Sequence, residues 1–478
     1  MSYDRSLLQT AKVSLLSSFS VLLLFLGFYD DCWRVADRYW FDDFQHDDES
    51  LVIGRIVKSR QDGIFSSGGL TGSGSLDGRA ISYLDPAERS NQIPADASEL
   101  KPKTIQDNQY LAYFNGLRFV TYTTYNSQIG GQGMFFSMLD RSTTFSPREK
   151  YHFFQAFTSV LSALALTAII LWFYLEFGLT VALFVLASAV CSQWLVVFGR
   201  NLWWSTWSFY LPVAVMMHQL RFKWEAMKIQ WFTLGAAAFL TIFIKCLFTG
   251  YEYITTTLVM MTVPLVYYGS LRAWSYRKFL TGFSIAAFSS CLAIFLTFVI
   301  LCFQVASVKG SFRYGVNHII YSFAARTHAN PNDFSAEYAA GLESSTVSVL
   351  TQYLRGTFFY PHRYLSISNK FISDHFLRWT YLHLILLFLM VSGMLYIFRN
   401  RCFSEEEKRK RLALIWATWF SILAPLSWFI IFKAHSYCHP HMNFIIWQMP
   451  FVFFGFALCG LVAKSLLPGS MNQAQLNS

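Results

Sequence analysis

Long apolar runs separated by short polar segments make up most of the sequence, with one run near the N-terminus and the others after residue 150. Ten runs approach the roughly 20 residues that a helix needs to cross a bilayer. They lie at 13–29, 151–173, 179–197, 202–217, 231–248, 253–268, 283–304, 379–398, 412–432 and 444–462. The pattern predicts an all-α polytopic membrane protein of about ten transmembrane helices.

The first run follows Arg5 and Lys12 and ends at Asp30 and Asp31, without a small-residue cleavage site. This arrangement indicates a retained anchor and not a cleaved signal. The basic residues of the later polar segments gather in alternate loops, at 221–228, 272–278 and 399–411. Since cytoplasmic loops collect Lys and Arg, both termini are predicted to be cytoplasmic.

This topology leaves two long loops on the non-cytoplasmic side of the membrane. The predicted parts are a tail and first helix at 1–29, a large loop at 30–150, helices two to seven at 151–304, a second loop at 305–378, and helices eight to ten with a tail at 379–478. In the first loop, the Gly- and Ser-rich stretch 66–78 lacks the Lys-Ser/Thr ending of a P-loop. It predicts a flexible connection.

Composition supports the same class of protein. Hydrophobic residues make up 54% of the chain and charged residues 14%, against roughly 25% charged in soluble domains. The formal charge of +10 comes from short clusters between apolar runs. Membrane topology explains such clusters better than a basic face for nucleic acid does, so no nucleic-acid partner is expected.

An acidic stretch directly follows the first predicted helix. Between residues 30 and 49 it holds eight Asp and Glu residues against Arg34 and Arg38. Acidic residues are common on translocated loops, which is one explanation. The other comes from the apolar positions 51, 53, 56 and 57, whose nearly helical spacing places Asp47, Asp48 and Glu49 at the start of a short helix. The helix dipole would then help to keep these carboxylates ionised.

At this point the sequence resembles the GT-C superfamily of membrane glycosyltransferases, which includes protein O-mannosyltransferases and the aminoarabinose transferases of lipid A. The resemblance covers an Asp-Glu pair after the first helix, then a short helix and a Gly-aliphatic step, here Asp48-Glu49 through Gly63-Ile64. The cytoplasmic start of the first helix and the large outer loop also look like that fold.

The resemblance implies a GT-C-like fold and an inverting transferase whose donor is a polyprenyl-phosphate-linked sugar. Asp48, with Asp47 or Glu49 as alternatives, would accept a proton from the acceptor as it attacks the anomeric carbon. The resemblance implies no particular cofactor, and a divalent cation is compatible with it.

Cations near the outer helix ends are candidates for binding the donor phosphate, and Arg200 and Lys433 fit this description. Trp203 beside Arg200 is a candidate for contact with sugar or lipid. The alternative is that Arg200 and its neighbouring tryptophans only anchor a helix end at the membrane interface.

The segment 433–441 gathers His435, His439 and His441 beside Lys433. Three interpretations stay open: binding of the carrier phosphate, ligation of a metal, and interfacial polarity. The metal interpretation lacks a helical His-x-x-x-His context because Pro440 interrupts the segment.

Glu252 and Tyr253 lie in an outer turn between two predicted helices and are candidates for substrate binding. Glu252 is either a second carboxylate of the site or the partner of Lys245 or Arg200, since a charge near hydrocarbon seeks a partner. The partner interpretation is the stronger one.

Taken together, the sequence predicts a glycosyltransferase that moves a sugar to a lipid, glycan or protein acceptor on the non-cytoplasmic face. A transporter or flippase of lipid-linked saccharides, or a non-catalytic assembly subunit, are the alternatives. The sequence contains no Asn-x-Ser/Thr sequon, which favours a bacterial inner membrane with a periplasmic active site.

Overall fold

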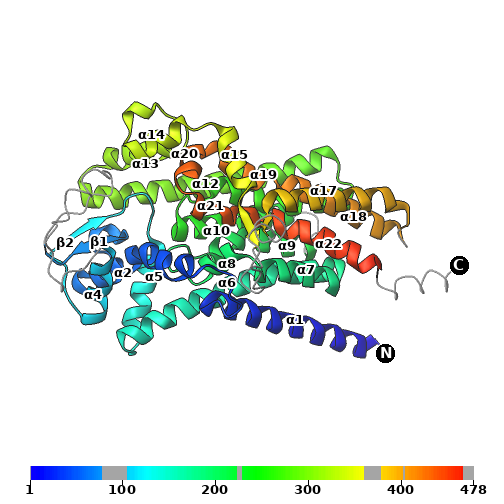
Figure 1. Cartoon of the computed structure of the whole chain (residues 1–478), viewed down its shortest axis with the longest axis horizontal. Helices are drawn as coiled ribbons and strands as arrows, with labels where there is room; N and C mark the ends of the chain where they lie inside the picture. The colour runs from blue at the N-terminus through cyan, green and yellow to red at the C-terminus, as the bar shows by residue number, and fades with distance from the viewer. Residues whose placement is uncertain (1, 78–104, 223–228, 360–377, 402–403, 467–478) are drawn as a thin grey trace, which may run out of the picture.

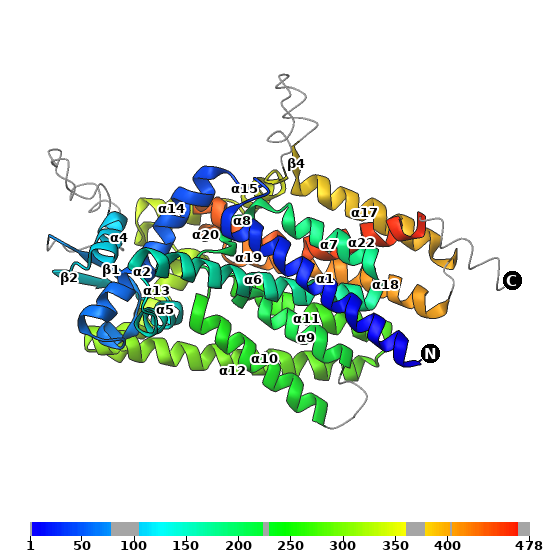
Figure 2. The same ribbon diagram turned by 90° about the horizontal axis from the view of Figure 1, so that it is seen from below.

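A bundle of long helices forms the main body of the computed structural model, which describes residues 2–77, 105–222, 229–359, 378–401 and 404–466. A lobe of shorter elements lies at one end of this bundle (Figures 1 and 2). The bundle consists of α1 (Ser2–Asp30), α6 (Pro147–Phe177), α7 (Leu179–Val190), α8 (Gln193–Gly199), α9 (Trp207–Phe222), α10 (Ile229–Thr249), α11 (Ile254–Leu271), α12 (Tyr276–Lys309), α17 (Tyr381–Ile397), α18 (Glu405–Ser421), α19 (Leu423–Ile431) and α22 (Phe451–Leu466).

Six helices of the described chain are long and apolar enough to cross a membrane, and the number rises to eight if each of two bent pairs is one span. The spans are 9–30, 147–177, 231–249, 254–271, 276–309 and 405–431. These helices define a polytopic, nearly all-α membrane protein, as the apolar runs predicted. The number of ten spans stays a prediction.

The two bent pairs break where the chain cannot continue a regular helix. In the first, α7 and α8 meet at 69° around Ser192, whose hydroxyl accepts the amide of Leu195 and so begins a new helix. In the second, a segment ending at Gln448 meets α22 at 41°, with Pro450 between them. Proline has no amide hydrogen to donate to the preceding turn.

The predicted helix over 202–217 begins later than expected, at Trp207. Residues 202–206 form a turn because the side-chain oxygen of Asn201 accepts the amides of Trp203 and Trp204 at 2.8 and 2.9 Å. These bonds take the place of helical ones. An apolar pattern alone does not reveal them.

The lobe is built from the first long loop and contains the only sheet of that region in the described residues. Strands β1 and β2 pair antiparallel, with Gly72 opposite Thr124. Its elements are a π-helical turn (Tyr39–Asp43), α2 (Phe44–Asp62), a 3-10 turn (Ser66–Gly69), β1 (Gly72–Ser75), α4 (Ile105–Asn115), β2 (Thr121–Thr124) and α5 (Gly131–Ser142).

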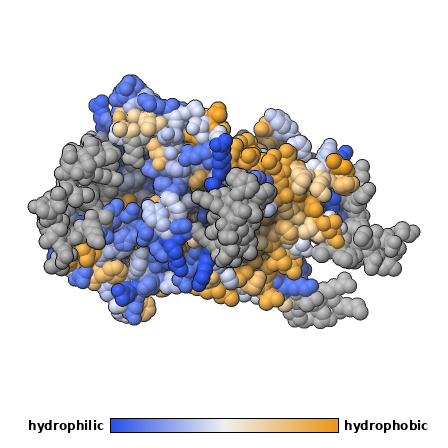
Figure 3. Space-filling view, viewed as in Figure 1, coloured by the Kyte–Doolittle hydropathy of each residue, from blue (hydrophilic) through white to orange (hydrophobic). Residues whose placement is uncertain are grey.

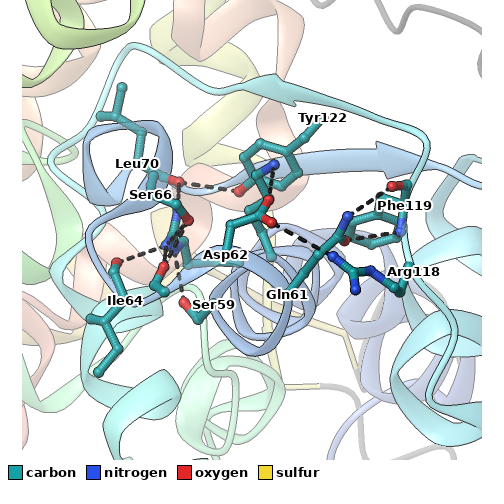
Figure 4. Close-up of polar contacts among 12 residues, drawn as sticks. Ser59, Gln61, Asp62, Ile64, Ser66, Leu70, Arg118, Phe119 and Tyr122 are labelled. Atoms are coloured by element: carbon teal, nitrogen blue, oxygen red, sulfur yellow. Dashed lines mark hydrogen bonds and ion pairs between the residues drawn. The ribbon is translucent and has the colours of Figure 1, made fainter.

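Arg55 holds the turn that follows α2. Its guanidinium is fully buried and donates to the carbonyls of Gly63, Ile64 and Ser66 at 3.0, 2.7 and 2.6 Å. Nearby, the Gln61 amide exchanges two hydrogen bonds with the backbone of Phe119 (Figure 4). These contacts satisfy backbone groups that no helix or strand pairs, and so give the lobe a defined shape.

The prediction of a flexible connection at 66–78 is wrong for its described part. Strand β1 lies here and all four of its residues are buried. A side chain on Gly72 would lie 2.2 Å from the carbonyl oxygen of Thr123, and one on Gly74 would lie 2.1 Å from the Phe119 ring. The glycines therefore permit close backbone packing, a role that composition does not distinguish from flexibility.

The second long loop forms a layer over the same end of the bundle, next to the lobe (Figure 1). It contributes α13 to β4, and the short helices before α22 lie beside it. These elements are α13 (Phe312–Arg326), a 3-10 turn (Pro331–Asp333), α14 (Ala336–Glu343), α15 (Thr346–Leu354), β3 (Thr357–Phe359), β4 (Trp379–Thr380), α20 (Lys433–Cys438), α21 (Pro440–Asn443) and a 3-10 turn (Phe444–Gln448). A further 3-10 turn (Phe398–Arg401) connects α17 to α18 and lies outside this layer.

Hydrophilic residues gather over the lobe and the second loop, whereas hydrophobic residues gather toward the opposite end of the molecule (Figure 3). That opposite end holds the start of α1 and the end of α22 (Figure 2). It is called the terminal end below, and the end with the lobe is called the lobe end. The candidate site residues of the sequence belong to the lobe end.

Candidate functional site

Three consecutive carboxylates in α2 point to three different surroundings, because successive residues of a helix are rotated by about 100°. Asp47 is exposed, Asp48 is half-buried and Glu49 is fully buried. The Asp48 carboxylate accepts a hydrogen bond from the indole nitrogen of Trp204 at 2.6 Å. Of the three acids, Asp48 therefore combines a fixed position with partial access.

Burial raises the pKa of Asp48 to about 7, and the carboxylates of Asp47, Glu49 and Glu252 add to the rise. The bond from Trp204 acts in the opposite direction. The prediction that the helix dipole keeps this acid ionised is wrong in direction. Desolvation outweighs the dipole, and α2 also continues directly from a π-helical turn, where the Phe44 amide is already bonded.

Glu49 connects three parts of the fold. Its carboxylate accepts the hydroxyl of Tyr151 at 2.6 Å, the side-chain amide of Gln155 at 3.3 Å and the backbone amide of Leu202 at 3.0 Å. It thereby joins α2 to α6 and to the turn before α9. With its acceptor oxygens occupied in this way, Glu49 acts as a structural link.

Trp204 is itself held by an aromatic neighbour. Its ring stacks on Tyr253 with centroids 5.7 Å apart, and the Tyr253 hydroxyl donates to the Met442 carbonyl. Tyr253 is fully buried, and Trp203 is nearly so, with its ring edge-on to Tyr125. Of the two predicted substrate contacts, Tyr253 is thus part of the packing that holds Trp204, and Trp203 packs against Tyr125.

Glu252 has a cationic partner, but a different one from those predicted. Its carboxylate lies 3.6 Å from the guanidinium of Arg326, which also donates to the Tyr125 hydroxyl at 3.2 Å. Lys245 instead donates to the backbone carbonyls of Gly250 and Glu252. Burial alone would lower the pKa of Arg326, but Glu252, Tyr125 and Tyr338 together outweigh burial and raise that pKa.

The histidines of 433–441 lie beside this ion pair. His435 is buried, with Nε2 4.0 Å from the Glu252 carboxylate and its ring 5.0 Å from that of His439. Burial, with the positive potential of its neighbours, holds the pKa of His435 well below its ordinary value. His435 is therefore neutral and is a poor cationic ligand for phosphate.

His441 belongs to an aromatic group with Trp40 and Phe44. Its ring stacks on Trp40 at 5.1 Å and meets Phe44 edge-on at 5.0 Å. Within the described residues no three His, Cys, Asp or Glu side chains are grouped to hold a metal ion. Pro440 begins a new short helix after His439, so the three histidines do not share one helix.

The two predicted phosphate clamps are engaged with the protein itself. Arg200 donates to the carbonyls of Tyr29 and Phe41 at 3.0 and 3.1 Å and contacts the Asp42 carboxylate at 3.1 Å. Lys433 donates to two carbonyls at the end of α14, both at 2.8 Å. Arg200 therefore links the end of α1 to the π-helical turn, and Lys433 caps the end of α14.

The fold therefore brings Asp48, Glu252 and His435 into one electrostatic neighbourhood, together with Trp204 and Arg326. Trp204 and Arg326 were not among the residues predicted to form the site. Trp204 has a sequence signal, because it directly follows Trp203 in an outer turn. Arg326 has one only as part of the second long loop, whose mixture of basic and aromatic residues suits a phosphate or a sugar.

Fold and site together define this protein as a polytopic helical membrane protein with a carboxylate-centred polar cluster at its lobe end. No family model matches the chain, and no curated protein or solved structure matches it either.

Proposed function

We propose that this protein is a glycosyltransferase that moves a sugar from a polyprenyl-phosphate donor to a hydroxyl-bearing acceptor at the lobe end. The observation that carries the proposal is Asp48, a half-buried carboxylate oriented by Trp204, whose pKa is raised to about 7. A general base works best when its pKa lies near the working pH. The resemblance to GT-C enzymes, drawn from 48–64, supports the same role.

In the proposed reaction, the acceptor hydroxyl attacks the anomeric carbon while Asp48 takes its proton. The bond from the anomeric carbon to the phosphate oxygen breaks, and the polyprenyl phosphate leaves with the bonding electrons. Attack from the opposite face inverts the configuration. The phosphate is a reasonable leaving group, so one base and a nearby cation suffice.

Arg326 replaces Arg200 and Lys433 as the proposed cation for the departing phosphate. It is the guanidinium of the cluster, with its side chain 18% exposed, and it is positioned by Glu252 and Tyr125. Arginine binds phosphate oxygens through a planar fork of donors. In this proposal the stacked rings of His441 and Trp40 contribute the apolar surface that a sugar face packs against.

The test uses the purified full-length protein and labelled polyprenyl-phosphate sugars. Asp48→Asn keeps an oxygen that accepts the Trp204 indole but cannot take the proton. We expect it to lose about 100-fold or more in turnover. Asp47→Asn, at the exposed neighbouring position, is the matched control and is expected to keep its activity. Equal turnover of wild type and Asp48→Asn would refute the assignment of the base.

A transporter of lipid-linked saccharides is the second candidate, and the bent pairs favour it. Discontinuous helices form the substrate sites of many transporters, and α7 with α8 is bent by 69°. Movement of a fluorescent lipid-linked sugar across proteoliposomes, without transfer to any acceptor and without dependence on Asp48, would identify a transporter instead.

A further inference from the structure

A second feature lies at the terminal end, far along the bundle from Asp48. A cavity of about 860 Å³ opens between α1, the junction of α6 and α7, and the end of α22. Much of its wall consists of the exposed side chains of Leu15, Phe19, Leu179 and Leu183. A cavity of this volume is within the range of ligand-binding sites.

Two lysines from opposite ends of the sequence line this apolar cavity. Lys12 is exposed on α1, near the start of the membrane span 9–30. Lys464, in the last turn of α22, donates to the carbonyl of Phe177 at 3.1 Å. Lys12 thus lies near the start of a candidate span and Lys464 near the end of a helix, and we expect both at the depth of the bilayer headgroups.

Glu176 also lines the cavity but does not cancel this charge. Its carboxylate forms an ion pair with Arg221 and accepts the hydroxyls of Tyr267 and Tyr268 at 3.0 and 2.7 Å. The cavity therefore keeps a positive potential from Lys12 and Lys464 above an apolar wall. A phosphodiester with two acyl chains has the complementary distribution of charge and apolar surface.

An adjoining cavity of about 260 Å³ shares Glu176 and Lys464 but differs in its charges. There Lys410 pairs with Glu406 at 2.9 Å and Arg411 with Glu407 at 3.5 Å. Apart from the shared Lys464, its cations are paired with carboxylates, so the larger cavity, which adds Lys12, is the better site for an anion.

We propose that the larger cavity binds an anionic phospholipid of the leaflet at the terminal end. Its phosphate lies by Lys12 and Lys464, and its acyl chains lie along Leu15, Phe19 and Leu183. A single lysine that reaches the interface needs no ligand. Two lysines over one concave apolar wall form a site, and this site does not depend on the proposed transferase activity.

The first experiment measures lipid binding to the full-length protein by native mass spectrometry, with phosphatidylglycerol and phosphatidylcholine of identical acyl chains. Phosphatidylglycerol is expected to bind about tenfold more tightly. The double variant Lys12→Gln, Lys464→Gln should remove this preference. Arg277→Gln, an exposed cation at the start of α12 outside the cavity, is the control and should keep it.

Lys12→Gln alone is informative even if loss of the Lys464 contact impairs folding, because Lys12 is exposed. It should weaken phosphatidylglycerol binding several-fold at an unchanged melting temperature. Equal binding of the two lipids by wild type, or an unchanged preference in the lysine variants, would overturn the proposal. Competition by water-soluble glycerol phosphate as strong as by the lipid would also overturn it.

A second variant tests the apolar wall. Leu183→Trp fills the cavity and should reduce phosphatidylglycerol binding, whereas Leu164→Trp, at an exposed apolar position of α6 that does not line the cavity, should not. If Leu183→Trp changes the oligomeric state and leaves lipid binding unchanged, the wall is an interface between copies of the chain and the lipid site is refuted.

Discussion

Two carboxylates at opposite ends of the bundle have contrasting surroundings. Glu176, near the terminal end, has an arginine and two tyrosine hydroxyls as partners. Asp48, at the lobe end, has one neutral donor, the indole of Trp204, and other carboxylates near it. Glu176 is therefore fully compensated, while Asp48 remains able to exchange a proton.

What distinguishes the structural acid Glu176 from the reactive acid Asp48 is the set of partners of each carboxylate, and not how deeply each is buried. Removing a carboxylate from water costs free energy at both sites, but only at Glu176 does an ion pair with a cation offset that cost. At Asp48 the uncompensated cost appears as a pKa near 7. Such a perturbed group in a polar cluster is a functional candidate with a physical reason.

The largest effect on stability is expected from Glu176→Gln. The amide leaves the Arg221 guanidinium without a counter-charge, so the free energy of unfolding should fall by about 1–3 kcal/mol. Thermal unfolding in one detergent measures this change. Glu406→Gln is the control, since that carboxylate is 74% exposed and its loss should cost less than about 0.5 kcal/mol. An unaltered melting temperature for Glu176→Gln would show that the partners of Glu176 do not stabilise the fold, and the distinction drawn between Glu176 and Asp48 would fail.

A smaller loss is expected from Arg200→Gln, which removes the bonds to the carbonyls of Tyr29 and Phe41. If Arg200 is an anchor, stability should fall by about 1 kcal/mol and the KM for the donor should not change. Arg200→Lys is the discriminating variant. Lysine keeps the positive charge but lacks the planar pair of guanidinium donors. If Arg200 binds the donor phosphate, Arg200→Lys should therefore recover part of the donor binding that Arg200→Gln loses; if Arg200 is an anchor, neither variant should change donor binding.

The smallest effect concerns the pH dependence of turnover. The pKa of Asp48 is lowered by the Trp204 bond, so Trp204→Phe should raise that pKa above about 7. A base acts when deprotonated, hence activity falls as the pH drops through the pKa. The fall in kcat/KM should move to higher pH by about one unit in Trp204→Phe. Trp203→Phe, whose ring packs on Tyr125, should leave the profile in place.

The sequence predicted the elements that depend on local pattern. The apolar runs predicted α6, α10 and α11 close to their observed bounds and the apolar parts of the longer helices α1 and α12, and the spacing after Glu49 predicted α2. It also selected Asp48, Glu252 and His435, which the fold brings together. Each of these follows from periodicity or from a charge placed beside an apolar run.

Contacts between distant segments could not be predicted in this way. Arg326 and not Lys245 pairs with the Glu252 side chain, because α13 folds back over the turn before α11. Arg200 is occupied by carbonyls from the end of α1 and the π-helical turn. A single sequence contains no measure of such distances, and so it cannot distinguish a clamp from an anchor.

Helix α12 has a mechanical consequence. Its 34 residues extend about 51 Å at 1.5 Å each, well beyond the roughly 30 Å of a hydrocarbon core. Near its far end, Gln304 donates to the carbonyls of Gly68 and Ile129 in the lobe at 2.9 and 3.1 Å. We therefore expect α12 to set the distance between the lobe and the bilayer. A thicker or thinner membrane that tilts this helix would carry the lobe, and Asp48 with it, toward or away from the lipid surface.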